Sequence, residues 1–221
     1  MHAAMNIEQA RFNMIEQQIR PWDVLDAHVL HLLSVVRRED FVPAQHRALA
    51  FVDMEIPLPD GQCMLAPRVE ARMLQDLAVQ KHEKVLEIGA GSGYMAALLA
   101  HRAQHVLSLE ISAELARMAR ANLQLAGIHN ADVRQQDGTR EMQAAGPFDV
   151  IVLSGSTAEV PQQLLQRLKI GGRLGVIVGD EPMMQATFMT RVGETQFHTI
   201  QPWDTVAPRL LNFPEPSRFR F

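Results

Sequence analysis

The chain of 221 residues is long enough for one well-filled hydrophobic core with additions. Its hydrophobic fraction of 47% and charged fraction of 21% are typical of globular proteins and exclude an intrinsically disordered chain. The single cysteine, Cys63, excludes an internal disulfide and a multi-thiolate metal cluster, and the formal net charge of -4 provides no general attraction for nucleic acid. No segment approaches the roughly 18 to 20 consecutive apolar residues of a membrane helix, and the N-terminus lacks the pattern of a secretion signal, so we expect a cytoplasmic protein.

Residues 6–50 are predicted to be helical. The segment DVLDAHVLHLLSVV (23–36) carries apolar residues on one broad face, with Asp23 as its expected N-cap. His28 and His31 lie at helical spacing, but no third metal ligand is evident nearby. We therefore interpret the histidines as surface or half-buried side chains and predict no metal site.

Prolines and a glycine interrupt the next segment, DMEIPLPDGQCMLAP (53–67), which is predicted to be an irregular loop. A helix is expected to begin with Pro67 in its first turn and to run through RVEARMLQDLAV (68–79). At helical spacing Glu70 is expected to point to solvent. Cys63 is interpreted as a small buried loop residue, because no histidine lies near it in the sequence to activate the thiol.

From residue 83 onward, short apolar runs alternate with amphipathic stretches. The predicted strands are 84–89, 105–110, 131–137, 147–155, 171–179, 183–192 and 195–203, and the predicted helices are 93–103, 112–127 and 160–168. Ser112 is the expected N-cap of the second of these helices, and Gly127 lies just past its end. The alternation predicts a parallel sheet covered on both faces by right-handed crossovers, with the last two strands as an antiparallel hairpin at the edge.

The fold class is therefore α/β: a Rossmann-like, doubly wound, mostly parallel sheet with an N-terminal helical extension. We expect an extension over residues 1–82 packed on a core over residues 83–221, together one structural domain. The C-terminal tail NFPEPSRFRF (212–221) is expected to cover an edge of the sheet. The tripeptide Pro-Trp-Asp occurs at 21–23 and again at 202–204, which is too short to indicate an internal repeat.

The segment VLEIGAGSGY (85–94) places three glycines within five positions at a predicted strand-to-helix turn. A triphosphate-binding loop would continue with Lys and then Ser or Thr, whereas Tyr94 and Met95 follow Gly93. A dinucleotide-binding turn has the spacing G-x-G-x-x-G, whereas this turn has G-x-G-x-G. Glu87 would repel a phosphate but attracts the ammonium and sulfonium of S-adenosylmethionine. The turn alone also fits a second interpretation, in which the glycines only allow close helix–sheet packing.

Two further acids end the next two predicted strands. Glu110 lies about 20 residues after the glycines, where a carboxylate accepts hydrogen bonds from a ribose diol. Asp137, followed by Gly138, ends the third strand, where an acid meets an adenine amino group. Open α/β sheets bind ligands at these strand ends, so the three features together favour S-adenosylmethionine.

The sequence resembles the protein-L-isoaspartate O-methyltransferases, a family with the seven-stranded methyltransferase fold. The resemblance covers nearly the whole chain and includes HLLSVVRREDFVP, IPLPDGQCMLAP, VLEIGAGSGYMAALLA, QQDG, GPFDVIVLSG and LKIGGRLGVIVG. It implies that the loop over 57–68 forms the wall of the substrate site. It also implies the following cofactor contacts: Glu87, Ile88, Gly89, Ala90, Gly91, Ser92, Gly93, Glu110, Ile111, Asp137 and Gly138.

One departure from the family concerns catalysis. The family places a serine three residues after the Gly-Gln pair, where its hydroxyl lies close to the transferred methyl group, and this chain has Leu65 at that position. An isoaspartyl residue exposes an α-type carboxylate with a pKa of about 3.3 to 3.7, which is already ionised at neutral pH and needs no general base. Loss of one orienting hydrogen bond to this charged group therefore weakens the reaction without abolishing it.

Two other residues are catalytic candidates beside Leu65. The guanidinium of Arg68 is suited to binding a carboxylate through two hydrogen bonds. Arg68 also fits a role as a capping or exposed surface residue of the helix that it begins. Ser154, with Ser156 and Thr157, follows the fourth strand and offers hydroxyl donors, or belongs to an ordinary turn.

The resemblance implies methyl transfer to isoaspartyl proteins or peptides. The alternatives are methyl transfer to another carboxylate or small molecule, and cofactor binding without transferase activity. No acidic cluster follows the fourth strand to hold magnesium, and the motifs of base-methylating enzymes are missing there, so neither a metal nor a nucleic acid is expected at the site. The oligomeric state is not readable from the sequence.

Overall fold

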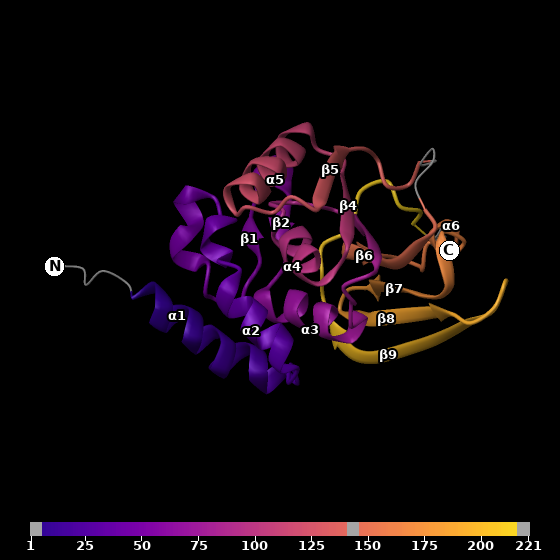
Figure 1. Cartoon of the computed structure of the whole chain (residues 1–221), viewed down its shortest axis with the longest axis horizontal. Coiled ribbons are helices and arrows are strands. Elements are labelled where there is room, and N and C mark those ends of the chain that lie inside the picture. The colour runs from indigo at the N-terminus through magenta and orange to yellow at the C-terminus, as the bar shows by residue number, and fades with distance from the viewer. Residues whose placement is uncertain (1–5, 141–145, 216–221) are drawn as a thin grey trace, which may run out of the picture.

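The computed structural model describes residues 6–140 and 146–215 of the chain. Its centre is a seven-stranded sheet with the strand order β5-β4-β3-β6-β7-β8-β9 (Figure 1). The strands are β3 (Lys84–Ile88), β4 (His105–Glu110), β5 (Ala131–Gln135), β6 (Phe148–Thr157), β7 (Leu168–Asp180), β8 (Met183–Arg191) and β9 (Phe197–Thr205). β3 to β7 pair in parallel, whereas β8 pairs antiparallel with both β7 and β9. The predicted parallel sheet with an antiparallel hairpin at its edge is confirmed.

The winding of the sheet changes direction at β3. The chain passes from β3 to β4 and β5 on one side, and then returns to β6 on the other side of β3. Connections that leave neighbouring parallel strands in opposite directions open a crevice at the carboxyl ends of those strands, and open α/β sheets bind their ligands there. The glycine turn follows β3 at this point.

Helices cover both faces of the sheet. Helices α3 (Pro67–Leu77), α4 (Tyr94–Arg102) and α5 (Ala113–Leu125) pack on one face, and the short α6 (Gln162–Leu165) packs on the other (Figure 1). Adjacent residues of β3 point to opposite faces, so Val85 belongs to the first hydrophobic cluster and Leu86 to the second. The predicted N-cap of α5 is confirmed, because the Ser112 side chain accepts a hydrogen bond from Leu115 N.

The predicted helix over 160–168 is wrong in length. Only Gln162–Leu165 is α-helical, because the residues that follow are drawn into the sheet. Arg167 accepts a backbone hydrogen bond from Phe148 N, and Leu168 pairs with Phe148 at the start of β7. Sheet pairing has therefore overridden the helical pattern over the last residues of this segment.

The N-terminal extension is helical, but its segments are short. They are α1 (Ile7–Met14), a π-helical turn (Ile15–Ile19), a 3-10 turn (Arg20–Trp22), α2 (Ala27–Val35) and two further 3-10 segments (Arg38–Asp40 and Ala44–Leu49). The expected N-cap of α2 is wrong. Asp26 caps the helix by accepting from His28 N at 2.7 Å, whereas Asp23 has a left-handed backbone conformation that lies outside the helix.

The segment between the extension and α3 is mainly irregular, as predicted, but it contains one small element. Two-residue strands β1 (Ile56–Pro57) and β2 (Cys63–Met64) pair antiparallel across a 3-10 turn (Pro59–Gly61). Ser112, at the start of α5, donates a hydrogen bond to Asp60 in this turn. The hairpin is thereby held beside the carboxyl end of the sheet. We call residues 56–66 the substrate loop.

The two Pro-Trp-Asp tripeptides meet in space. The rings of Trp22 and Trp203 are 6.0 Å apart in an edge-to-face arrangement, although 180 positions of sequence separate them. Helix α3 lies between the two segments: Arg72 donates to Trp22 O at 2.8 Å, and Trp203 Nε1 donates to Asp76 at 2.7 Å. These contacts join the N-terminal extension to the last strand of the sheet through α3.

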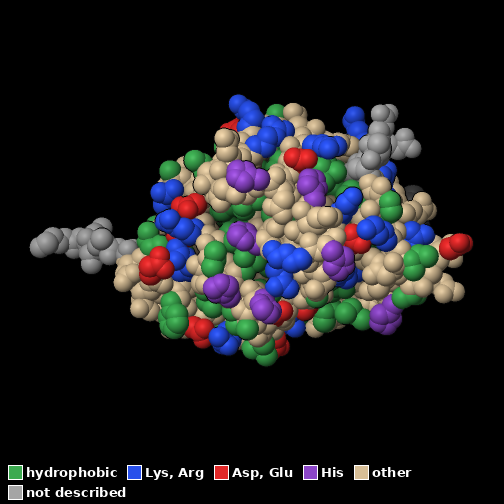
Figure 2. All heavy atoms as spheres, viewed as in Figure 1, with side chains coloured by type: hydrophobic (Ala, Val, Ile, Leu, Met, Phe, Trp, Pro, Cys, Tyr) green, Lys and Arg blue, Asp and Glu red, His purple; other side chains and the backbone are tan. Residues whose placement is uncertain are grey.

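The larger hydrophobic cluster runs from Met14 to Ala207 and crosses the expected boundary between residues 82 and 83 without interruption. None of the described helices is long and apolar enough to span a membrane. Every histidine that the structure describes is exposed or half-buried, and several are visible on the face shown in Figure 2. This confirms the interpretation of the described histidines as surface side chains.

Candidate active site

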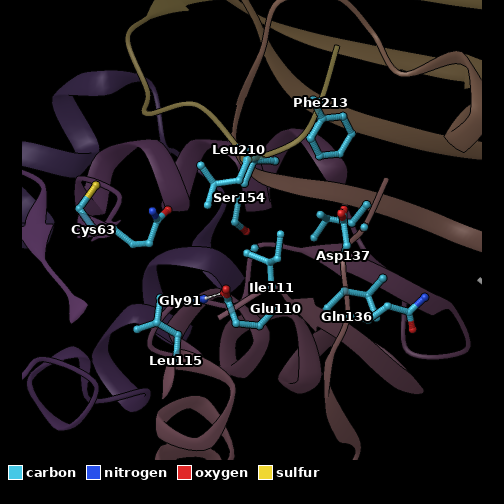
Figure 3. Close-up of a pocket in the computed structure, with 16 residues that line it drawn as sticks. Cys63, Gly91, Glu110, Ile111, Leu115, Gln136, Asp137, Ser154, Leu210 and Phe213 are labelled. Carbon is cyan, nitrogen blue, oxygen red and sulfur yellow. Dashed lines mark hydrogen bonds between the residues drawn. The ribbon is translucent and has the colours of Figure 1, made fainter. Parts of the chain in front are cut away.

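A pocket opens at the carboxyl ends of β3, β4, β5 and β6, and we call it the first pocket. It encloses about 520 Å³ of space that contains no protein atoms, including the open solvent at its mouth. Figure 3 shows side chains from four separate parts of the chain pointing toward this space. They come from the substrate loop, the strand ends, α5 and the C-terminal segment, and they include Gln62, Cys63, Leu115, Leu210 and Phe213.

The glycine turn forms the floor of the first pocket through its backbone. Gly89 and Gly91 line the pocket, and both have positive φ angles of 92° and 52° that favour glycine. Gly93 also has a positive φ angle, of 88°, and a Cβ atom there would lie 3.1 Å from the Ala119 backbone of α5. The turn therefore serves both packing and site geometry, and the two interpretations raised by the sequence do not exclude each other.

Glu110 lies at the end of β4 and is buried beside the turn. Its Oε2 accepts a hydrogen bond from Gly91 N at 2.8 Å (Figure 3). Its Oε1 accepts from Ser112 N at 3.0 Å. Each carboxylate oxygen has a second lone pair, so the two backbone donors orient the group without saturating it. Glu110 can therefore accept two further hydrogen bonds from a diol in the pocket.

Glu87 lies beneath the turn and has no exposed surface. Its carboxylate accepts hydrogen bonds from two neighbouring strands, from Ser108 on β4 and, at 2.9 Å, from Ser154 at the end of β6. Burial raises the pKa of Glu87 to about 7, against the opposing effect of the two serine hydroxyls. Glu87 does not itself line the pocket, but it fixes the hydroxyl of Ser154, which does.

Asp137 follows β5 on the far side of the first pocket. Its Oδ1 accepts from the backbone N and the hydroxyl of Thr139, and its Oδ2 accepts from the side-chain amide of Asn212 at 2.8 Å. Burial opposes ionisation, but these hydrogen bonds outweigh it and lower the pKa of Asp137 below its ordinary value. The adjacent Gly138 lines the same pocket, and a Cβ atom there would collide with Ile88.

A second, smaller pocket of about 260 Å³ adjoins the first one. The two pockets share Cys63, Gly89, Gly91 and Ser154, so these residues mark the junction. The remaining wall of the second pocket is formed by Met64, Leu65, Glu70, Ala90, Ser92, Tyr94 and Met95. Met64 and Leu65, which belong to the substrate loop, are almost fully buried, and Leu65 is 7% exposed.

Glu70 is not directed to solvent as expected. It is buried in the wall of the second pocket and forms an ion pair with Arg38, which also donates to Leu65 O at 2.8 Å. The guanidinium of Arg38 lies 5.0 Å from the centre of the Tyr94 ring. The prediction for Glu70 failed because an arginine 32 positions earlier in the chain supplies a buried partner that local helical spacing does not reveal.

Arg68 lies outside both pockets. Its guanidinium forms an ion pair with Asp53 and lies 4.5 Å from the centre of the Trp22 ring. Neither pocket has a Lys, Arg or His side chain among its described lining residues. Because Glu110 and Asp137 line the first pocket, its lining favours a cationic ligand over a phosphate-bearing one, whereas Glu70 in the wall of the second pocket is already paired with Arg38.

The model of the protein-L-isoaspartate(D-aspartate) O-methyltransferase family matches residues 9–202. The chain belongs to this family. A protein-L-isoaspartate O-methyltransferase of Rhodopseudomonas palustris is 43% identical over 185 residues, which cover 83% of this chain and 85% of the relative. A second relative of the same name, from Syntrophobacter fumaroxidans, is 39% identical over 88% of this chain and 91% of its own length. As a member of this family, the chain is an S-adenosylmethionine-dependent O-methyltransferase.

Solved structures show the same fold at low sequence identity. A structure from Plasmodium falciparum, described as a β-aspartate methyltransferase in complex with S-adenosyl-L-homocysteine, superimposes with a TM-score of 0.77 at 18% identity. It covers 93% of this chain and 98% of its own. A further protein-L-isoaspartate O-methyltransferase structure has a TM-score of 0.76 at 22% identity, over 92% of this chain and 65% of its own.

Most of the family residues expected at the cofactor site lie around the junction of the two pockets. Ile88, Gly89, Gly91, Glu110, Ile111, Asp137 and Gly138 line the first pocket, and Ala90 and Ser92 line the second. Glu87 and Gly93 line neither pocket: Glu87 accepts a hydrogen bond from Ser154, and Gly93 allows close packing of the turn on α5. Gln62 belongs to the loop over 57–68 that the resemblance assigned to the substrate wall, and it lines the first pocket. Sequence reasoning did not find Gln136, Leu210 or Phe213, and no local pattern marks the C-terminal residues.

Proposed function

We propose that the enzyme methylates the free α-carboxylate of isoaspartyl residues in proteins and peptides, with S-adenosylmethionine as the methyl donor. The observation that carries the proposal is the junction of the two pockets at Cys63, Gly89, Gly91 and Ser154. A donor in the first pocket would face an acceptor in the second across this junction. The names of the relatives, which describe methyl transfer to isoaspartate, support the same reaction.

The residues of the first pocket fit the cofactor. Glu110 keeps an acceptor lone pair on each oxygen for the ribose hydroxyls, and the ionised Asp137 can accept from the adenine amino group. Glu87 has no cationic partner among the described residues, so its charge is available to balance a cation at the junction. When bound, the cofactor supplies an activated methyl group on a sulfonium.

The second pocket would hold the acceptor. The isoaspartyl carboxylate is ionised at neutral pH, so the protein contributes placement and removal of water and need not supply a base. Met64, Leu65 and Met95 provide a buried apolar wall that excludes water from the reacting oxygen. Desolvation raises the reactivity of the carboxylate toward the methyl group.

One hydroxyl, that of Tyr94, is proposed to orient the acceptor where the family serine is replaced by Leu65. Ser154 also lies at the junction, but its hydroxyl donates its single proton to Glu87 at 2.9 Å and so has none left to donate to a carboxylate. Tyr94 lines the second pocket, and its buried hydroxyl has no hydrogen-bond partner among the described residues, so it keeps a free donor. Arg68 has no role in this proposal, because Asp53 and Trp22 already engage its guanidinium.

The test is transfer of a labelled methyl group to a synthetic peptide that contains isoaspartate. A peptide of the same sequence with ordinary aspartate is the control for substrate class. We expect labelling of the isoaspartyl peptide alone, as a base-labile methyl ester. Labelling of neither peptide, by a preparation that binds S-adenosylhomocysteine, would contradict the proposed acceptor.

Variants at Leu65 test the catalytic argument. Leu65→Ser restores a hydroxyl at the family position, and we expect kcat/KM to rise by about 10-fold or more, since a hydrogen bond to a charged group is worth roughly 1.5 to 3 kcal/mol. Leu65→Ala is the matched control, because it creates the same space without a hydroxyl. An equal gain in kcat/KM in both variants would show that the added space, and not the hydroxyl, causes the increase.

A further inference from the structure

The C-terminal segment over residues 207–215 approaches the first pocket with Leu210 and Phe213, from the side opposite the glycine turn (Figure 3). Leu210 and Phe213 point into the pocket from above, whereas Gly91, Glu110 and Leu115 bound it from below. Phe213 is 8% exposed and belongs to the hydrophobic cluster on the α6 face of the sheet. The described part of the tail, residues 212–215, therefore covers the carboxyl ends of the strands and not a sheet edge. Residues 216–221 lie outside the described part.

The upstream half of this segment is fixed firmly to β6. Ser156 N donates to Pro208 O at 2.8 Å, Leu210 N donates to Ser156 O at 2.9 Å, and the Ser156 hydroxyl donates to Ala207 O at 2.7 Å. The side chain of Leu210 fills the space left by Gly89 and Gly155, where a Cβ atom would lie within 3 Å of it. These contacts place the segment immediately above the glycine turn.

The downstream half is held mainly by side chains. Residues 211 and 212 form a turn, and no backbone hydrogen bond ties residues 211–215 to a strand or helix among the described residues. The contacts that remain are the amide of Asn212 on Asp137 Oδ2 at 2.8 Å, the burial of Phe213, and an exposed ion pair of Glu215 with Arg209 at 2.8 Å. A segment with few backbone hydrogen bonds opens at low cost in free energy.

Asn212 contacts the carboxylate that the proposed function assigns to the adenine amino group, and the aromatic ring of Phe213 follows it in the chain. Asn212 occupies one oxygen of Asp137 while Thr139 occupies the other, so the carboxylate is held in a single orientation. Phe213 is the only aromatic residue among the described side chains that line the first pocket. A flat apolar ring beside an oriented acceptor of N–H hydrogen bonds is suited to a purine base.

We propose that residues 211–215 form a gate over the adenine end of the cofactor pocket, with Phe213 as a cofactor-binding residue and Asn212 as a positioning residue that orients Asp137. The inference rests on the proposed function, because it assumes an adenosine-containing cofactor. The gate separates from Asp137 when the cofactor enters or leaves. Phe213 contributes affinity by contact with the base, and Asn212 sets the rate of exchange.

Calorimetry with S-adenosylhomocysteine and with adenosine tests the role of Phe213. Phe213→Ala should weaken both ligands by the same factor, about 5- to 150-fold, since contact of a base with an aromatic ring is worth about 1 to 3 kcal/mol. Phe213→Trp should restore affinity. The matched control is Phe12→Ala, at a phenylalanine that is 59% exposed on α1 and far from the site in the chain. Should Phe213→Ala not fold, Phe213→Leu keeps most of the apolar volume but removes the flat ring. It should also weaken both ligands by one common factor, smaller than that of Phe213→Ala.

The hydrogen bond from Asn212 to Asp137 is tested with Asn212→Gly, because Asn212 has a φ angle of 66° that glycine adopts without strain. We expect faster dissociation of S-adenosylhomocysteine and weaker amide-exchange protection of residues 211–215, with no change in thermal midpoint. Dissociation rates and affinities within twofold of wild type in both variants would overturn the gate. Failure of wild-type protein to bind S-adenosylhomocysteine would instead overturn the proposed function.

Discussion

Replacing Glu87 by glutamine should make the protein more stable relative to wild type as the pH rises from 5 to 8. Glu87 is fully buried, accepts from the hydroxyls of Ser108 and Ser154, and has no cationic partner among the described residues. Its pKa of about 7 in the folded state exceeds the ordinary value of 4.5. The folded state therefore binds the proton more tightly than the unfolded state, and wild-type stability falls as the pH rises through the window from about 4.5 to about 7. Glutamine has the same shape, hydrogen-bonds to both serines and does not titrate.

The magnitude follows from the two pKa values. A difference of about 2.5 pKa units, at about 1.36 kcal/mol each, is worth about 3 kcal/mol in total, of which about 2.5 kcal/mol develops between pH 5 and pH 8. The measurement is urea denaturation of both proteins without cofactor at these two pH values, read as the difference in free energy of unfolding. Titrating groups that do not interact with Glu87 are common to both proteins and cancel, whereas Glu110 and Glu70 repel Glu87 and add to the difference.

The matched control is Asp149→Asn. Asp149 is held by Lys169 at 2.8 Å, and although burial opposes ionisation, this ion pair lowers its pKa below 3.8, so the carboxylate stays ionised over the whole range. The stability difference between this variant and wild type should be the same at pH 5 and pH 8. A constant difference for Glu87→Gln as well, within about 0.5 kcal/mol, would refute the argument that burial without a cation governs this carboxylate.

Three further predictions concern other parts of the site. Glu110→Gln should raise the dissociation constant of S-adenosylhomocysteine by about 10-fold or more in calorimetry, because a hydrogen bond to a charged group is lost; an unchanged constant would place the ribose elsewhere. Gly93→Ala should lower the thermal midpoint more than Gly127→Ala, since both positions have positive φ angles but only Gly93 also crowds the Ala119 backbone; equal losses would show that crowding there has no effect. Arg68→Ala should leave the KM for an isoaspartyl peptide unchanged while lowering stability by about 1 kcal/mol, and a KM increase of tenfold or more would return Arg68 to the acceptor site.

The sheet and the floor of the site were predictable because their signals are local. An apolar run followed by a glycine turn specifies a strand and the start of a helix, and parallel pairing then brings the ends of β3, β4 and β5 together. Glu110 and Asp137 were placed correctly on this basis, at the edge where they line the first pocket. The length of the helix after β6 was wrong, because sheet pairing at Leu168 overrode its local pattern.

The remaining walls of the site were not predictable, because they depend on contacts between distant parts of the chain. Glu70 follows a helical pattern that indicates exposure, and only its ion pair with Arg38 makes burial tolerable. Phe213 lies in a proline-rich tail without periodicity, and its place over the pocket depends on the hydrogen bonds of Ser156 with the preceding residues. Asn212 is an ordinary turn residue until the fold brings it to Asp137.

The tryptophan fluorescence of the protein comes from the edge-to-face pair of Trp22 and Trp203, because these are its only two tryptophans. Their emission arises from one location, where the N-terminal extension, α3 and the last strand come together. A red shift therefore reports separation of the extension from the sheet, with no contribution from the cofactor pocket, whose described lining contains no tryptophan. Intrinsic fluorescence is thus a direct probe of that joint, and quenching by a ligand would indicate movement transmitted through α3.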